Sequence, residues 1–209
     1  MNFNFDEEIP NGVSIDKNAK NGENIRASTS IANNTRTILK FRALVKNGGP
    51  MDYKTQGKEF ENFGNYNYGV LGRSMGIDKN FLNAAAGALQ AKNIMSAYLK
   101  NGKKWFDDNN FTDADKIKYM KYTEIADKIN DKIGTEKTKD LDLFRYFLNE
   151  SIKIGQKSGN YGYFDDPKDQ KYINDGYEDA KNSGYGNDFK LITFDDFDIY
   201  NGFGSLFFL

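Results

Sequence analysis

The chain of 209 residues is 38% hydrophobic and 28% charged, a composition that suits a single globular domain with its own core. Its 29 basic and 30 acidic residues nearly cancel, so no overall field favours nucleic acid or an anionic membrane. Histidine and cysteine are both absent, which excludes imidazole acid–base schemes, thiol nucleophiles, disulfides and thiolate zinc sites. Any catalysis must therefore use Asp, Glu, Lys, Arg, Tyr, Ser or a metal held by oxygen ligands.

The first third of the chain predicts one helix between two irregular segments. Residues 1–27 mix Asn, Gly, Asp and Lys with isolated apolar residues, so we expect an irregular lead-in there. From 30 to 45 apolar residues recur at helical spacing, and Gly48-Gly49-Pro50 ends this helix. Residues 50–77 crowd Gly, Asn, Tyr and Phe together without an amphipathic period, which is typical of a loop that shapes a polar site.

The rest of the chain predicts four further helices. Each one combines an apolar stripe with a capping residue, a following glycine or a proline at its first position. Their expected ranges are 79–100, from 112 or 113 to 133, 139–154, and a short helix that begins at Asp166-Pro167.

These elements predict an all-α or mostly-α fold. We expect a single compact helical domain over 28–185, lysozyme-like in architecture, followed at 186–209 by a Phe-rich tail that packs on the body or on a partner. A second Gly/aromatic loop at 159–164 contains Tyr161, another candidate substrate ligand. The two Gly/aromatic loops are expected to line one cleft.

No targeting or membrane-spanning segment is apparent in the sequence. The N-terminal residues lack the basic and apolar regions of a Sec signal, and no apolar stretch approaches the roughly 20 residues that cross a bilayer. We therefore expect a soluble chain, made in the cytoplasm and not inserted in a membrane. A specialised secretion system or cell lysis would carry it to a target cell envelope.

Glu61 is the first candidate for a catalytic group. Phe60 and Phe63 flank it, and a carboxyl group in an apolar pocket has the raised pKa that a general acid needs near neutral pH. The alternative is that Glu61 caps or pairs locally and that the neighbouring rings belong to the core. The candidates for hydrogen bonding to a sugar or stacking on it are Asn65, Tyr66, Asn67 and Tyr68.

An acidic cluster late in the chain offers the second carboxylate. Asp165 and Asp169 would act as base or nucleophile in a two-carboxylate glycosidase. With Asp166 they would also offer oxygen ligands to a divalent cation, although no cofactor is expected. The alternative is that Asp166 and Asp169 cap a helix N-terminus, where acidic residues interact favourably with the helix dipole.

Two further segments offer candidate substrate ligands. Asp52 and Lys54 flank Tyr53 directly after a helix end, where they bind substrate or fix the loop through a salt bridge. Arg73 would clamp an anion, since guanidinium matches the geometry of carboxylate and phosphate. The run Gly69-x-x-Gly72 is not a phosphate loop, because no strand precedes it and no Gly-Lys-Ser/Thr follows.

Three blocks of the chain are distinctive. They are Asn47-Gly48-Gly49-Pro50-Met51-Asp52-Tyr53-Lys54, Glu61-Asn62-Phe63-Gly64-Asn65-Tyr66-Asn67-Tyr68-Gly69 and Asp165-Asp166-Pro167-Lys168-Asp169-Gln170. Together with residues 12–18, they resemble the bacterial polymorphic toxin type 44 family over roughly residues 10–180. The middle block is the most specific, whereas the segment 100–155 is longer than the family's and the tail after 185 has no counterpart in it.

The resemblance implies a mostly helical toxin domain used in competition between bacteria. Such domains often form the C-terminus of a larger secreted protein, and each has a cognate immunity protein as its partner. The resemblance does not assign catalytic residues.

Three functions fit these observations. The favoured one is an antibacterial toxin that hydrolyses peptidoglycan as a lysozyme-like glycosidase, with Glu61 as general acid. The alternative enzyme is a toxin ribonuclease that uses Glu61 with Lys54 and Arg73, but the neutral charge and the lack of a basic stripe count against nucleic acid as a partner. The third is a non-enzymatic binding module whose aromatic loops contact a protein.

Overall fold

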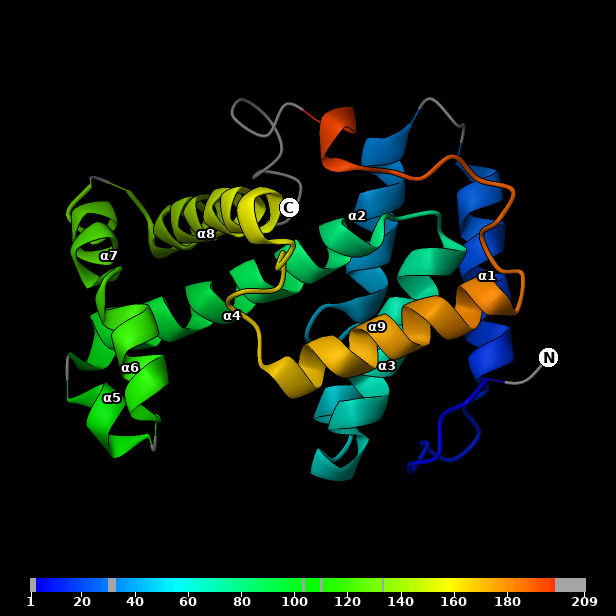
Figure 1. Ribbon diagram of the computed structural model, residues 1–209, viewed down its shortest axis with the longest axis horizontal. Helices are drawn as coiled ribbons and strands as arrows, with labels where there is room; N and C mark the ends of the chain where they lie inside the picture. Colours follow the sequence, from blue (N-terminus) through cyan, green and yellow to red (C-terminus); the bar gives the residue numbers. More distant parts are fainter. Residues whose placement is uncertain (1–2, 30–32, 103, 110, 133, 198–209) are drawn as a thin grey trace. The chain divides into compact units, whose positions relative to one another are not determined.

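The computed structural model describes residues 3–29, 33–102, 104–109, 111–132 and 134–197 (Figure 1). Over these ranges the chain forms α-helices and short 3-10 helices, and its only strand-like pairing is a parallel bridge between Ile77 and Ile192. The predicted mostly helical fold is therefore confirmed. The part of the predicted tail at 198–209 lies outside the described residues.

The elements follow one another along the chain with short connections. In order they are α1 (Ile15–Ser28), α2 (Asn34–Val45), η1 (Tyr53–Thr55), η2 (Lys58–Phe60), α3 (Glu61–Ser74), α4 (Lys79–Asn101), α5 (Trp105–Asp108), α6 (Asp113–Met120), α7 (Thr123–Asn130), α8 (Glu136–Ser158), α9 (Pro167–Asn182) and η3 (Phe194–Asp196).

The chain divides into two compact units. The described residues of 1–83 and 166–197 form the first unit, which contains α1, α2, α3 and α9. The described residues of 84–165 form the second, which contains α5 to α8. Helix α4 begins in the first unit and continues into the second.

Helix α3 is the core helix of the first unit, with eleven of its fourteen residues buried. A β-carbon on Gly69 would lie 2.0 Å from the carbonyl oxygen of Ile173 on α9, and one on Gly176 would lie 2.0 Å from the carbonyl oxygen of Tyr66. Glycine at both positions therefore lets the two helix backbones touch. The prediction of a loop over 50–77 is wrong for α3, because its glycines are contact points between helices.

Several other boundaries differ from the predictions. The predicted irregular lead-in contains α1, which Ser14 caps by accepting a hydrogen bond from the Lys17 amide at 3.3 Å. The single helix expected up to Ile133 is instead α6 and α7, and residue 133 lies outside the described residues. Helices α2 and α4 are confirmed. Helices α8 and α9 are longer than predicted.

The second unit has an aromatic core around Phe164, which is fully buried. Its ring packs on Tyr122 and Phe147 at centroid distances of 5.2 and 5.1 Å, and its carbonyl accepts a hydrogen bond from the Tyr119 hydroxyl at 2.7 Å. The predicted loop at 159–164 therefore belongs to this unit. Because the first predicted Gly/aromatic loop is largely helix α3 of the other unit, the expected pair of loops is not formed.

Candidate active site

Three of the predicted site residues converge at the N-terminal ends of α3 and α9. Glu61 is the first residue of α3, Asp169 lies in the first turn of α9, and Lys54 comes from η1. The Lys54 Nζ atom lies 3.7 Å from Asp169 Oδ2, and the charge of Glu61 acts on the Asp169 carboxyl group. Residues from three separate segments thus form one cluster.

Close packing against α3 places Lys54 in this cluster. A β-carbon on Gly64 would lie only 2.6 Å from Lys54 Cγ, so a larger residue there would push η1 away. Asn65, one turn after Glu61, is 2% exposed, and its side-chain nitrogen has no hydrogen-bond partner among the described residues. A buried donor without a hydrogen bond costs stability, and Asn65 is too buried to offer this donor to a sugar.

Asp169 is a partly buried carboxyl group with a raised pKa. Its side chain is 22% exposed, and burial raises its pKa above the ordinary value. The ammonium group of Lys54 acts in the opposite direction, whereas the nearby carboxylates of Glu61 and Asp166 raise the pKa further. Asp169 therefore holds its proton to a higher pH than a free carboxyl group does.

Glu61 lies in a different environment from the predicted one. Its side chain is exposed at the start of α3, so the prediction of an apolar pocket between Phe60 and Phe63 is wrong. Phe63 instead points into the core, where its ring contacts Tyr53 at a centroid distance of 4.9 Å. The less exposed carboxyl group of the two is therefore Asp169, and the more exposed one is Glu61.

The remaining acidic residues of the late cluster have other positions. Asp166 caps α9 by accepting a hydrogen bond from the Lys168 amide at 2.7 Å, which confirms the capping alternative for this residue. Asp165 is buried in the second unit, whereas Asp169 belongs to the first. Within the described residues no group of three or more acidic side chains is arranged to hold a metal ion.

Asp52 fixes the loop before η1. Its Oδ2 atom accepts hydrogen bonds from the Gly48 amide at 2.8 Å and from the Thr55 hydroxyl at 3.0 Å. Asp52 therefore fixes the loop, which was one of the two roles predicted for it. It does so through these two hydrogen bonds and not through the predicted salt bridge to Lys54. Asp52 is 7% exposed, so its carboxylate is available to the loop and hardly to a substrate.

A buried amide network lies beneath the cluster. The Asn18 side-chain nitrogen donates to the Tyr53 hydroxyl at 2.9 Å and to Asn67 Oδ1 at 2.8 Å. Tyr53 and Asn67 are 5% and 0% exposed, so neither offers a surface to a sugar. Asn18 was not among the sequence candidates, because it lies on α1 within the predicted irregular lead-in.

The other predicted substrate ligands are engaged in packing. Tyr66 is 1% exposed, and its hydroxyl donates to Asp179 Oδ2 at 2.7 Å. The ring of Tyr68 packs on Phe41 at a centroid distance of 5.0 Å. In this conformation the face of Tyr66 is closed to a sugar ring.

Arg73 and Tyr161 also have local partners. The Arg73 guanidinium lies 5.7 Å from the centre of the Tyr177 ring and donates a hydrogen bond to Asn187 Oδ1. In the second unit, Tyr161 lies directly against Gly155, where a β-carbon would come within 2.2 Å of its ring. Both contacts hold neighbouring segments together.

No family model, curated protein or solved structure matches this chain. The resemblance to the polymorphic toxin type 44 family therefore stays a prediction. Within the described part of the chain, every helix is too short or too polar to cross a membrane.

Proposed function

We propose that the chain is an antibacterial toxin that hydrolyses the glycan of peptidoglycan through two carboxyl groups. The observation that carries this proposal is the cluster of Lys54, Glu61 and Asp169, which joins three separate segments. The chemistry needs no histidine, thiol or cofactor, so it is available to this composition.

The environments of the two carboxyl groups suggest different roles from those predicted. Asp169, whose pKa is raised by burial, donates its proton to the glycosidic oxygen as the bond breaks. Glu61, which is exposed, attacks the anomeric carbon or accepts a proton from the water that does so. The ammonium group of Lys54 then stabilises the carboxylate left on Asp169.

The proposal includes the biological setting that the family resemblance implies. The target would be the envelope of a competing bacterium, reached through a specialised secretion system or after lysis. A cognate immunity protein would protect the producing cell.

The first test expresses the chain in a bacterium with and without a periplasmic signal sequence. We expect lysis only with the signal, and we expect Asp169→Asn and Glu61→Gln each to lower the release of soluble muropeptides from purified cell walls at least 100-fold. Glu59→Gln is the matched control, because Glu59 is an exposed carboxylate on η2 and is not one of the three residues of the proposed site. Circular dichroism confirms that each variant is folded.

Other outcomes would overturn the proposal. Growth arrest without the signal, together with loss of cellular RNA, would favour the ribonuclease alternative. Wall hydrolysis that survives both substitutions would place the catalytic groups elsewhere in the chain.

A further inference from the structure

Residues 3–9, named here the strap, form no helix and lie against a set of rings of the first unit, and this ring surface is named here the groove. The ring of Phe5 contacts Tyr66, Phe63 and Tyr172 at centroid distances of 4.7, 5.4 and 6.2 Å. Phe3 stacks on Tyr185 at 5.8 Å. Two aromatic side chains of the strap are thus held by rings from α3, α9 and the segment after α9.

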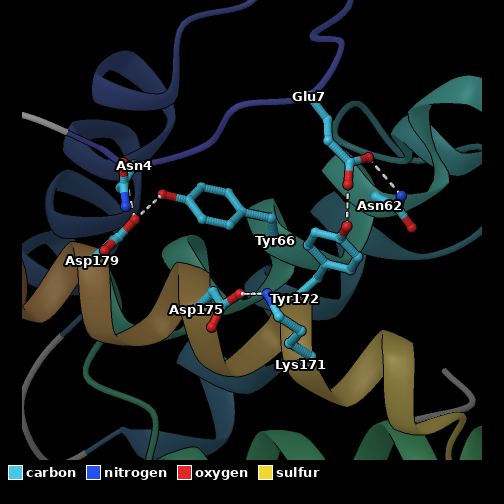
Figure 2. A network of polar contacts seen from close by, with 8 residues as sticks. All are labelled: Asn4, Glu7, Asn62, Tyr66, Lys171, Tyr172, Asp175 and Asp179. Carbon is cyan, nitrogen blue, oxygen red and sulfur yellow. Dashed lines mark hydrogen bonds and ion pairs between the residues drawn. The ribbon is translucent and has the colours of Figure 1, made fainter.

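Polar contacts fix the strap at two further points (Figure 2). The Asn4 amide donates to Asp179 Oδ2 at 2.9 Å, beside the Tyr66 hydroxyl that donates to the same atom. The Glu7 carboxylate accepts hydrogen bonds from the Asn62 side chain at 2.6 Å and from the Tyr172 hydroxyl. The bonds from Tyr172 and Asn62 are the main reason why the pKa of Glu7 is lowered. The positive charges of Lys168 and Lys171 lower it further.

The strap is attached to the body chiefly by its side chains. In the described part of the chain, the Asn4 amide makes the only backbone hydrogen bond from the strap to the body. The core beneath consists of buried residues from α1, α3, α9 and Tyr185, and Phe3 and Phe5 pack on its edge. The strap adds no helix or strand to the body, so we expect it to open at a lower free energy than the helices do.

We propose that this groove is a docking site for an extended segment of a protein partner with the pattern aromatic–x–aromatic–x–Glu, and that the strap is its resident occupant. The evidence is the chemistry of the strap itself, Phe3-x-Phe5-x-Glu7, in which two rings and one carboxylate make the contacts. This inference goes beyond the proposed enzymatic activity. Because Asn62 directly follows Glu61, a partner in the groove would lie beside the proposed catalytic cluster.

The strap and a partner segment would compete for the same surface. A tethered segment has an effective local concentration in the millimolar range, so it masks the groove from a free peptide. The apparent affinity for the peptide falls in proportion to the fraction of molecules whose strap is lifted. Weakening the strap must therefore tighten peptide binding, although the groove itself is unchanged.

The experiment titrates a fluorescein-labelled peptide of residues 3–10 with the full chain and follows fluorescence anisotropy. We expect the Phe3→Ala/Phe5→Ala chain to bind the peptide at least tenfold more tightly than the wild-type chain does. The matched control peptides carry Phe5→Ala or Glu7→Gln, and we expect each to bind the variant chain at least fivefold more weakly than the native peptide. A scrambled peptide tests for unspecific adhesion.

Equal binding of the peptide to the two chains, or equal binding of the native and scrambled peptides, would overturn the proposal. Hydrogen exchange of the wild-type chain gives a second test that does not depend on any variant folding. We expect the Asn4 amide to exchange at least 100-fold faster than the amides in the middle of α3. If it exchanges as slowly as they do, the strap opens only with the whole fold and cannot be displaced by a partner.

Discussion

Helices α3 and α7 are held in the structure by different means. On α7, Ala126 and Ile129 are buried, whereas Glu124 and Lys128 form an ion pair in water on the opposite side. On α3 the buried residues surround the helix, and glycines stand where other segments approach. Helix α7 is therefore held by an apolar stripe. Helix α3 depends in addition on glycines, whose missing side chains let neighbouring segments come close.

This difference changes what each helix tolerates. A stripe of side chains can be repacked, and its outer face accepts most polar residues. A backbone contact at glycine leaves no room for even one methyl group, because the opposing atoms are those of another main chain. The two helices should consequently respond very differently to substitution.

The largest effect is expected for Gly69→Ala. The added β-carbon would lie 2.0 Å from the Ile173 carbonyl oxygen, so α3 and α9 must move apart. We expect a loss of about 3 kcal/mol or more in the free energy of unfolding, measured with urea. Gly134→Ala is the control, since the nearest atom to its β-carbon is at 3.5 Å. A loss below about 1 kcal/mol for Gly69→Ala would show that the helices separate easily.

A smaller loss is expected for Asn18→Ala. The substitution removes the donor that serves the Tyr53 hydroxyl and Asn67 Oδ1, and it leaves both buried without that bond. We expect about 1–3 kcal/mol of lost stability in the same urea assay. The control Asn101→Ala removes an exposed bond to the Ala97 carbonyl and should change stability much less. Equal losses would mean that the buried network adds nothing beyond a surface bond.

Lys54→Met should change the pKa of Asp169 more clearly than it changes the free energy of unfolding. Without the ammonium group, the pKa of Asp169 rises further, and NMR titration of its carboxyl carbon measures this directly. A carboxyl pKa raised by folding lowers stability as the pH rises from the unfolded pKa through the folded one. In the variant this loss should begin at the same pH, because the unfolded pKa is unchanged, but it should continue to a higher pH and become larger. Lys58→Met on η2 is the control. An unchanged Asp169 pKa would show that the 3.7 Å contact does not persist in solution.

The smallest effect is expected for Lys128→Ala on α7. Its partner Glu124 is fully exposed, and side-chain entropy and solvent screening offset such ion pairs. We expect no change in Tm beyond experimental error in a calorimetric scan, with or without 0.5 M salt. A clear, salt-sensitive decrease would mean that surface charges contribute to the stability of α7.

The contrast between α3 and α7 also explains which helices could be predicted from the sequence. Apolar periods correctly indicated α2, α4 and α8. The same method failed on α3, where Gly and Asn lower helix propensity and tertiary contacts outweigh it. Helix α1 was missed for a similar reason, since its buried face includes Asn18 and Gly22.

The candidate site was predictable in its chemistry and not in its geometry. With histidine and cysteine absent, Glu61, Asp169 and Lys54 were natural choices, and the structure brings these three together. Which of the two carboxyl groups is less exposed depends on how α3 and α9 cross. A single sequence does not predict that crossing. The rings of Tyr53 and Tyr66 looked equally suited to a sugar until their burial was known.

The first unit is discontinuous in sequence, which affects when the site appears during synthesis. Asp169 follows Glu61 by 108 residues, and the described residues of the second unit, within 84–165, lie between α3 and α9 in the sequence. At a translation rate of roughly 5–20 residues per second, α3 waits several seconds or more for the helix that covers its glycine face. A ribosome-bound chain therefore carries the two halves of the proposed site unassembled until α9 emerges.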